Sequence, residues 1–306
     1  MRAIAILNRD GGTLKTTDLD AYCAHITKAF SEAGHEIECH PVGGSEIEQA
    51  LKKAAEDPQF EAIIAGGGDG TISAAAGIAF KSGKTLGVIP AGTMNLFARS
   101  LGMPLNIEEA ATALARSEVK SCDIATADGR PFVHQFSVGM QPRLVQNREE
   151  LQYRSRFGKM IASLRATLSM LSRPPAFLTR MTLDGETQEQ VFSMIAVANN
   201  PYGEGHMPYA DRLDQGVLGV YSAGKIDTGA GMRLSTDLVL GSWRTNENMR
   251  EETAREVVLQ FPRHKRKARA VIDGELVPLR RKTSIEIIPG ALKVLVPLAA
   301  NGGSQS

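Results

Sequence analysis

A glycine-rich segment at residues 66–71, Gly-Gly-Gly-Asp-Gly-Thr, has residue types that can bind phosphate. Glycine allows close approach of a ligand to the backbone, and free N–H groups at the start of a helix attract anions. The candidate phosphate-binding residues here are Gly67, Gly68, Gly70 and Thr71. Asp69 adds a negative charge, and a carboxylate beside phosphates can hold hydrated Mg²⁺ or accept a proton. The pattern fits equally a tight turn in which Asp69 caps a helix.

Two further glycine-containing loops follow predicted strands in the same part of the chain. Residues 8–15 read NRDGGTLK, and residues 90–99 read PAGTMNLFAR. The carboxyl ends of parallel strands lie at one edge of a sheet, where ligands bind. Three such loops therefore favour a nucleotide site over unrelated turns. The candidate nucleotide-binding residues in these two loops are Asn8, Gly11, Gly12, Gly92, Thr93 and Asn95.

Alternating strands and helices are needed to position these loops, and the first third of the chain shows that order. Strands are predicted at 2–8, 36–42, 61–68 and 85–90, and helices at 18–34, 46–57 and 71–83. The helix at 18–34 has apolar residues at helical spacing and ends at Gly34, a residue suited to a helix C-terminus. This order predicts an α/β N-terminal domain with a parallel, Rossmann-like sheet.

The pattern changes near residue 120. Asp-Gly turns at 128–129 and 184–185 separate alternating segments, as in β-hairpins. Further paired strands are predicted at 267–279 and 283–297. We therefore expect a mostly antiparallel β-sandwich domain with helical insertions near 148–172 and 228–243.

The motifs, taken together, resemble the diacylglycerol kinase catalytic-domain family, which includes bacterial lipid kinases, sphingosine kinases and ceramide kinases. The resemblance rests on GGGDGT followed about twenty residues later by PAGTMNLFAR, and extends over NRDGG, PYADRLDQGVLGVY at 208–221 and IDGE at 272–275. It implies a nucleotide-binding α/β domain at 1–120 and a β-rich lipid or acceptor domain at 121–300. The polar tail NGGSQS at 301–306 is expected to be frayed. ATP with Mg²⁺ would meet the lipid in a cleft between the two domains.

The resemblance also implies roles for individual acidic residues. Asp69 would handle the metal or the proton, and Glu275 would face the cleft as a general base. Asp214 matches one acid of a family segment and is a candidate ligand of a structural Mg²⁺. A plain hairpin turn remains the alternative for residues 272–275, because a similar LDGE occurs at 183–186.

Three substitutions depart from the family pattern. Leu96 stands where many bacterial members have Asp, Gln215 replaces the second acid of the Asp-Asp-Gly segment, and Arg9 replaces a proline. Leu96 removes one possible link in a metal–water network, and Gln215 weakens the case for the structural Mg²⁺. With Asp69 and Glu275 present, we interpret them as signs of a divergent bacterial branch with a different acceptor.

Net charge is +1, but basic residues concentrate in two segments, 143–180 and 263–282. The predicted helix at 148–172 is basic and amphipathic, so it could bind an anionic membrane surface peripherally or pack on the β domain with a solvated basic face. The run RHKRKAR at 263–269 lacks interleaved aromatic residues, which disfavours nucleic acid. A loop near the membrane or near an anionic substrate fits that run better.

The cysteine count indicates a reducing environment. Cys23, Cys39 and Cys122 match no metal motif and suggest no disulfide framework, so we expect three thiols. The start of the chain lacks the pattern of a signal peptide, and no apolar run is long enough to cross a bilayer. A cytoplasmic location is expected, with peripheral contact to the inner face of the membrane left open.

The sequence predicts an ATP-dependent kinase that phosphorylates a hydroxyl of a lipid or lipid-like acceptor. Two alternatives stay open. One is an NAD kinase, which shares a Gly-Gly-Asp-Gly loop. The other is a non-catalytic nucleotide or lipid sensor that keeps the fold, which Leu96 and Gln215 favour. The acceptor and the oligomeric state do not follow from the sequence.

Overall fold

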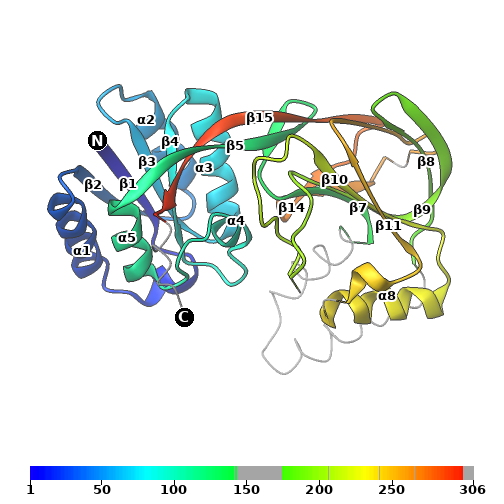
Figure 1. Cartoon of the computed structure of the whole chain (residues 1–306), viewed down its shortest axis with the longest axis horizontal. Helices are drawn as coiled ribbons and strands as arrows, with labels where there is room; N and C mark the ends of the chain where they lie inside the picture. The colour runs from blue at the N-terminus through cyan, green and yellow to red at the C-terminus, as the bar shows by residue number, and fades with distance from the viewer. Residues whose placement is uncertain (141, 143–173, 206, 241, 265, 299–306) are drawn as a thin grey trace, which may run out of the picture. The chain divides into compact units, whose positions relative to one another are not determined.

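The computed structural model describes residues 1–140, 142, 174–205, 207–240, 242–264 and 266–298 (Figure 1). The chain forms two compact units. The first comprises Met1–Ile124 together with the chain from Pro289 onward, and the second comprises Ala125–Ile288. We expected residues 121–300 to lie in the second domain. The difference arises because the last strand pairs within the first unit at Val294, opposite Leu86.

The first unit alternates strands and helices. Its elements are β1 (Arg2–Asn8), the short 3₁₀ helix η1 (Gly12–Thr16), α1 (Leu19–Glu32), β2 (Glu36–Val42), α2 (Ile47–Glu56), β3 (Ala62–Gly67), α3 (Asp69–Ser82), β4 (Thr85–Pro90), α4 (Leu96–Ser100) and α5 (Ile107–Ala115). Strand β5 (Ser117–Ala127) then leads into the second unit. The order of elements confirms the predicted α/β domain.

A parallel sheet with the order β2–β1–β3–β4 forms the centre of the first unit. Strands β1 and β3 are apolar and buried along most of their length, as expected for strands covered on both faces. Helices α1 and α5 pack together, as do α2 and α3 (Figure 1). The carboxyl ends of β1, β3 and β4 therefore place three glycine-containing loops at one edge of the sheet.

The second unit is mostly antiparallel β-sheet, as predicted. Its elements are β6 (Arg130–Phe132), β7 (Gln135–Gly139), β8 (Phe177–Leu183), β9 (Glu186–Ala198), β10 (Leu218–Gly224), α8 (Thr228–Leu240), η2 (Trp243–Thr245), β11 (Met249–Ala254), β12 (Glu256–Gln260), β13 (Arg269–Ile272), β14 (Glu275–Pro278) and β15 (Lys282–Pro297). Helix α8 coincides with the second predicted insertion. The first, at 148–172, lies outside the described residues.

Strand β9 organises the second unit because its two halves have different partners. Residues 186–192 pair with β8, whereas residues 194–198 pair with β7. The second half also pairs with β10. Buried side chains from these strands and from β12, including Phe136, Phe192 and Leu259, form one hydrophobic core.

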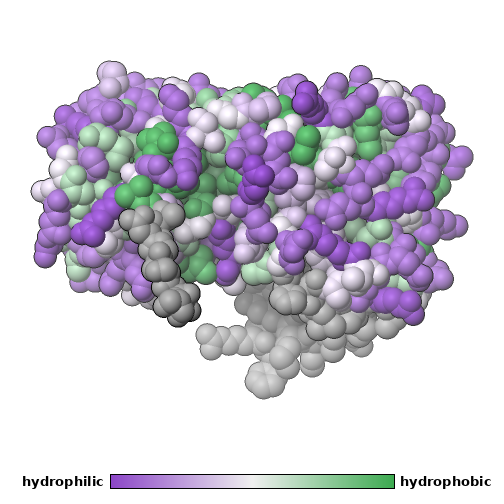
Figure 2. Space-filling view, in the orientation of Figure 1, coloured by the Kyte–Doolittle hydropathy of each residue, from purple (hydrophilic) through white to green (hydrophobic). Residues whose placement is uncertain are grey.

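Polar residues dominate the surface that Figure 2 shows, with hydrophobic residues in small separate patches. The mean hydropathy of −0.15 agrees with this distribution. Within the described part of the chain, none of the helices combines the length and hydropathy that crossing a bilayer would take.

The expectation of three unpaired cysteines is wrong. Cys23 in α1 and Cys39 in β2 form a disulfide, with 5.6 Å between their Cα atoms. Helix α1 packs against β2, and this packing brings the two thiols together. The disulfide was not predicted because three cysteines form no evident disulfide framework, although they can contain one disulfide and one free thiol. Cys122 is the buried free thiol, and burial, with a smaller effect from Asp123, raises its pKa to about 12.

We expect reduction of the Cys23–Cys39 disulfide to lower the free energy of unfolding by about 2–3 kcal/mol. The two residues are 16 positions apart, and closing a loop of about 15 residues is worth about 3 kcal/mol in the chain-entropy account. Urea unfolding with and without dithiothreitol measures the difference. The double variant Cys23→Ser/Cys39→Ser is the control and should not respond to reductant. Equal stability of the oxidised and reduced protein would contradict this expectation.

Candidate active site

Three loops meet at the carboxyl edge of the parallel sheet in the first unit. We call them the first loop (residues 8–12), the second loop (66–71) and the third loop (91–95). Backbone hydrogen bonds of 2.9 Å join them: Thr13, just beyond the first loop, donates to the Ala91 carbonyl, and Ala91 donates to the Gly67 carbonyl. The convergence predicted from the sequence is therefore present in the fold.

Side chains also connect the first loop to the second. The Asn8 side-chain amide donates to the Thr71 hydroxyl at 3.2 Å, and the Asn8 carbonyl oxygen Oδ1 accepts from the backbone of Asp10 at 3.1 Å. Thr71 is 8% exposed. Asn8 and Thr71, both predicted to line the nucleotide, thus also hold two loops together.

Several of the predicted glycines are required by contacts between the loops. A Cβ atom on Gly12, whose φ is +49°, would lie 1.6 Å from the Ala91 carbonyl oxygen. A Cβ atom on Gly92 would lie 2.7 Å from the Gly68 Cα atom, and one on Gly67 would lie 2.6 Å from the Thr71 side chain. These glycines are explained by packing alone.

Gly68 and Gly70 differ from these glycines because space surrounds them. A Cβ atom on Gly68 would have its nearest neighbour at 3.6 Å, and one on Gly70 would meet nothing within 4 Å. Helix α3 begins between them at Asp69, and its N-cap residue, Gly68, has no side chain that could cap it. The helix N-terminus is therefore open to a ligand, which suits an anion.

The Asp69 carboxylate connects the second loop to the third. One oxygen accepts from the backbone N–H of Asn95 at 3.1 Å, and the other accepts from that of Leu96 at 2.7 Å. These N–H groups lie at the start of α4. A carboxylate has about four acceptor positions, so capacity remains for a further contact. Asp69 thus has a structural role that the sequence did not reveal.

The Asn95 side chain folds back onto its own loop. Its Oδ1 accepts from the Gly92 backbone at 2.8 Å, and its Nδ2 donates to the Gly92 carbonyl at 3.0 Å. Asn95 has φ +50°, a left-handed conformation that asparagine tolerates better than most residues. Thr93 is exposed at the tip of the third loop. Asn95 therefore shapes this loop.

Glu275 lies at the start of β14 in the second unit. Its exposed carboxylate forms an ion pair of 2.5 Å with Arg130 of β6. Residues 272–275 form a hairpin turn with Asp273 at φ +46°, and residues 183–186 form a similar turn with Asp184 at φ +45°. The catalytic role of Glu275 stays a prediction.

Asp273 precedes Gly274 in the turn at residues 272–275 and holds neighbouring backbone in place, a role that was not predicted from the sequence. Its carboxylate is buried and accepts three backbone N–H bonds of 2.9 Å, from Val133, His134 and Gln135. Such bonds fix the segment that enters β7. The signal was available in principle, because an aspartate before a turn glycine often binds neighbouring backbone groups.

A buried tyrosine extends this network. The Tyr202 hydroxyl donates to the Gln135 side-chain oxygen. Burial raises the pKa of Tyr202 well above its ordinary value, and the nearby Tyr221 and Asp273 act in the same direction. The phenol therefore remains a donor at neutral pH.

Asp214 is exposed and pairs with Arg212 at 3.1 Å. Over the part of the chain that the structure describes, no three histidine, cysteine, aspartate or glutamate residues are grouped as ligands of a metal ion. The assignment of Asp214 as a metal ligand stays a prediction.

Comparisons with known families cover most of the chain. Residues 2–127 match the family described as diacylglycerol kinase catalytic domain. Residues 137–296 match the family described as YegS C-terminal NAD kinase beta sandwich-like domain. The two matches adjoin near the boundary between the two compact units.

Individual relatives agree with these families. A Staphylococcus epidermidis protein named "Putative lipid kinase" is 29% identical over 202 residues, which are 64% of this chain and 62% of that protein. A Staphylococcus aureus relative named as a lipid kinase in the same way is 25% identical over 92% of this chain and 89% of its own length. The chain thus spans less than two thirds of the first of these relatives.

A solved structure shows the same fold. The crystal structure titled as a putative diacylglycerol kinase from Bacillus anthracis aligns with a TM-score of 0.73 at 23% identity. The alignment covers 97% of this chain and 98% of that chain. Both units therefore have counterparts in one known protein.

Proposed function

We propose that the chain, in which residues 2–127 match the diacylglycerol kinase catalytic-domain family and residues 137–296 match the YegS C-terminal family, transfers the terminal phosphoryl group of ATP to a hydroxyl of a lipid or lipid-like acceptor. The observation that carries the proposal is the meeting of three loops beside the open N-terminus of α3. Such a site binds phosphate through backbone N–H groups and the helix dipole.

In this proposal the second loop binds the nucleotide phosphates. Gly68 and Gly70 leave room for phosphate oxygens, because no atom beyond their chain neighbours and the backbone of α3 lies within 3.5 Å of the position of their missing Cβ atoms. Packing between the loops, through Gly12, Gly67 and Gly92, keeps the N–H groups in place before the ligand arrives. Preorganised donors of this kind stabilise charge that develops during phosphoryl transfer.

Asp69 is the proposed contact to the metal ion or the proton. Mg²⁺ is commonly held by one or two carboxylates together with substrate phosphates and water. The Asp69 carboxylate can accept a further contact, so it fits that pattern. The ion, when bound, would neutralise negative charge on the phosphates. Glu275 is the proposed general base, and Asp214 is retained as a candidate ligand of a second, structural metal ion.

NAD kinase activity is the second candidate, because the family matched by the second unit is described as NAD kinase beta sandwich-like. The purified chain is incubated with [γ-³²P]ATP and Mg²⁺ and with one of three acceptors: diacylglycerol in mixed micelles, NAD⁺, or extracted membrane lipids. Labelled lipid supports the proposal, and labelled NADP⁺ supports the second candidate. ATP binding without transfer to any acceptor contradicts both and indicates a sensor.

A pair of glycine variants tests whether the second loop touches phosphate. We expect Gly68→Ala to fold with unchanged stability, because its Cβ would only reach ordinary contact distance, but to weaken ATP binding by at least ~10-fold by blocking a phosphate oxygen. Gly68→Val should abolish ATP binding. Isothermal titration calorimetry gives the affinities.

The control is Gly224→Ala, at a glycine that is equally open but lies at the end of β10. It should bind ATP normally. Unchanged ATP affinity in Gly68→Val would mean that the glycines serve the turn alone.

The proposed lipid acceptor bears on where in the cell the protein acts. We propose that the protein acts in the cytoplasm and contacts an anionic membrane surface peripherally to reach a lipid. The Cys23–Cys39 disulfide is unusual for a reducing compartment.

A further inference from the structure

Arg130 and Glu275 form an ion pair on the surface of the second unit, with 2.5 Å between a terminal guanidinium nitrogen of Arg130 and Oε2 of Glu275. The two side chains are 48% and 59% exposed. Exposed pairs of this kind contribute little to folding stability, because water screens the attraction and two long side chains lose freedom. Stability therefore gives little reason to place an arginine against the proposed general base.

A second Asp-Gly-Glu turn in the same unit has no such arginine. Residues 184–186 repeat residues 273–275, both aspartates have positive φ, and both of their carboxylates accept backbone N–H groups from neighbouring segments. Glu186, however, forms no ion pair with a residue that the structure describes. The turn itself thus does not require an arginine, and the contact with Arg130 is particular to Glu275.

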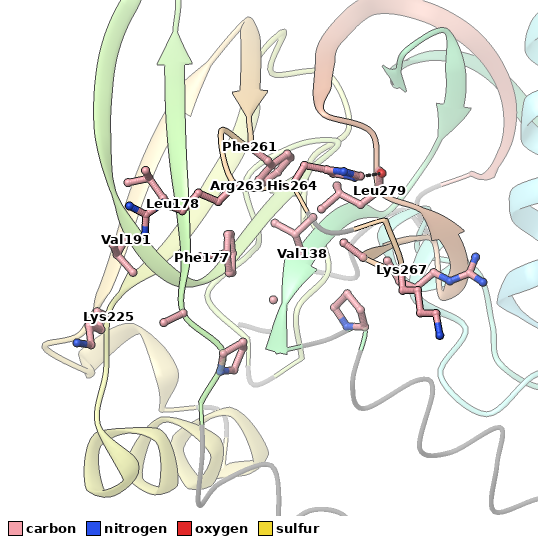
Figure 3. Close-up of a pocket in the computed structure, with 16 residues that line it drawn as sticks. Val138, Phe177, Leu178, Val191, Lys225, Phe261, Arg263, His264, Lys267 and Leu279 are labelled. Carbon is pink, nitrogen blue, oxygen red and sulfur yellow. Dashed lines mark hydrogen bonds between the residues drawn. The ribbon is translucent and has the colours of Figure 1, made fainter.

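Backbone contacts hold both members of the pair in place. The buried Asp273 carboxylate lies in the turn that leads to Glu275, and it accepts the N–H groups of residues 133–135, which directly follow β6. At the other end of the β13–β14 hairpin, the His264 ring nitrogen Nε2 donates to the Leu279 carbonyl at 2.7 Å (Figure 3). The arginine of β6 and the glutamate of β14 are therefore carried by segments that are anchored to each other.

Each member of the pair also keeps unused hydrogen-bonding positions. A guanidinium has several N–H donors in a planar fork, and among the described residues Arg130 donates only to Glu275. The other carboxylate oxygen, Oε1 of Glu275, accepts from none of the residues that the structure describes. Oε1 is thus available to a hydroxyl, and the remaining guanidinium donors are available to an anion.

We propose that Arg130 is a phosphate-binding residue whose charge Glu275 neutralises until the reaction frees it. The proposal rests on the proposed function and on Glu275 as its general base. In that reaction the acceptor oxygen forms a bond to the terminal phosphorus of ATP, and the bond from this phosphorus to the ADP oxygen breaks. The hydroxyl proton passes to the Glu275 carboxylate.

The ion pair loses its attraction at this step. A protonated glutamate is neutral, so Arg130 then carries an uncompensated positive charge. The new phosphate is attached to an oxygen that lies within hydrogen-bond reach of the base, and a guanidinium binds phosphate oxygens through two parallel N–H bonds. Arg130 therefore exchanges the carboxylate for the phosphate of the product.

Two ligands that differ only by a phosphate test this exchange. Calorimetry on the whole chain measures the binding of dioctanoyl phosphatidic acid and of dioctanoylglycerol, both below their micelle concentrations. Arg130→Gln should weaken phosphatidic acid binding by at least ~10-fold and leave dioctanoylglycerol binding within about twofold. Glu275→Gln, which mimics the neutral base, should instead tighten phosphatidic acid binding by about fivefold, because a like charge is removed beside the phosphate.

Arg180 and Glu189 provide matched controls. They form an exposed ion pair of 2.9 Å in the β8–β9 hairpin, which carries the second Asp-Gly-Glu turn. Arg180→Gln and Glu189→Gln change the net charge by the same amounts as the two test variants. Both should leave the two affinities unchanged. Effects as large as those of Arg130→Gln and Glu275→Gln would show a diffuse charge effect and contradict the assignment.

The transfer assay on the unaltered chain separates this proposal from the kinase proposal. Labelled lipid, with phosphatidic acid binding unchanged in Arg130→Gln or not tightened in Glu275→Gln, would overturn the role of Arg130 and leave the kinase proposal standing. No transfer to any acceptor, with both affinities shifted as expected, would contradict the kinase proposal and leave Arg130 as a phosphate-binding residue. Arg130→Lys keeps the charge without the planar fork, so it should give an intermediate affinity, and it replaces Arg130→Gln if that variant fails to fold.

Discussion

Asp69→Asn is expected to lower phosphoryl transfer by at least ~10²-fold. Loss of a group that handles the metal or the proton has this magnitude. In the structure the carboxylate also accepts the Asn95 and Leu96 N–H groups. Asparagine keeps one acceptor oxygen and turns an NH₂ group toward the other donor, which should destabilise the fold by about 1–3 kcal/mol. Steady-state turnover and thermal unfolding are therefore measured together.

Asp184→Asn is the control for this structural contribution. The Asp184 carboxylate likewise accepts two backbone N–H groups, from Arg255 and Glu256 at 2.9 Å, but it lies outside the three loops and has no proposed role in catalysis. We expect a similar loss of stability with turnover within about threefold of the unaltered chain. Near-normal turnover in a folded Asp69→Asn protein would limit Asp69 to holding the third loop.

Glu275→Gln is expected to reduce turnover by at least ~10²-fold while ATP affinity stays within about twofold. A general base acts in the transition state, so its loss lowers kcat, whereas loss of a ground-state contact weakens binding. The exposed side chain pairs only with Arg130 among the described residues. Removal of that surface ion pair should cost at most about 1 kcal/mol. Turnover and calorimetric ATP binding are compared on the same preparation.

The chain offers a matched control for this change. Glu186 occupies the same position in the Asp-Gly-Glu turn between β8 and β9, and that turn has the same left-handed aspartate. Glu186→Gln should leave turnover unchanged. A Glu275→Gln protein with normal turnover would mean that residues 272–275 form a hairpin turn with no catalytic role.

Much of the fold was predictable because local patterns and the overall architecture agree. The 3.6-residue periodicity of α1 predicted a helix, and the apolar runs of β1 and β3 predicted buried strands. Two features were not predictable from local patterns. Strand β15 leaves the second unit and pairs with β4 in the first, and Cys23 pairs with Cys39. Both depend on contacts between segments distant in sequence.

The site shows a similar division. Glycine spacing indicated three loops at one edge of the sheet, because parallel strands place their carboxyl ends together. It could not distinguish glycines required by packing, such as Gly92, from open ones, such as Gly68 and Gly70. That difference depends on which backbone lies opposite each residue.

The sequence by itself determined the order of elements, the α/β and antiparallel β units, and the family that the motifs resemble, since periodicity, turn residues and ordered motifs are local properties. The tertiary structure decided which backbone N–H groups each carboxylate binds. Asp69 accepts two N–H groups at the start of α4, and Asp273 accepts three from residues 133–135. A carboxylate's partners are the donors that folding brings within about 3 Å of it, and residue order does not specify those donors.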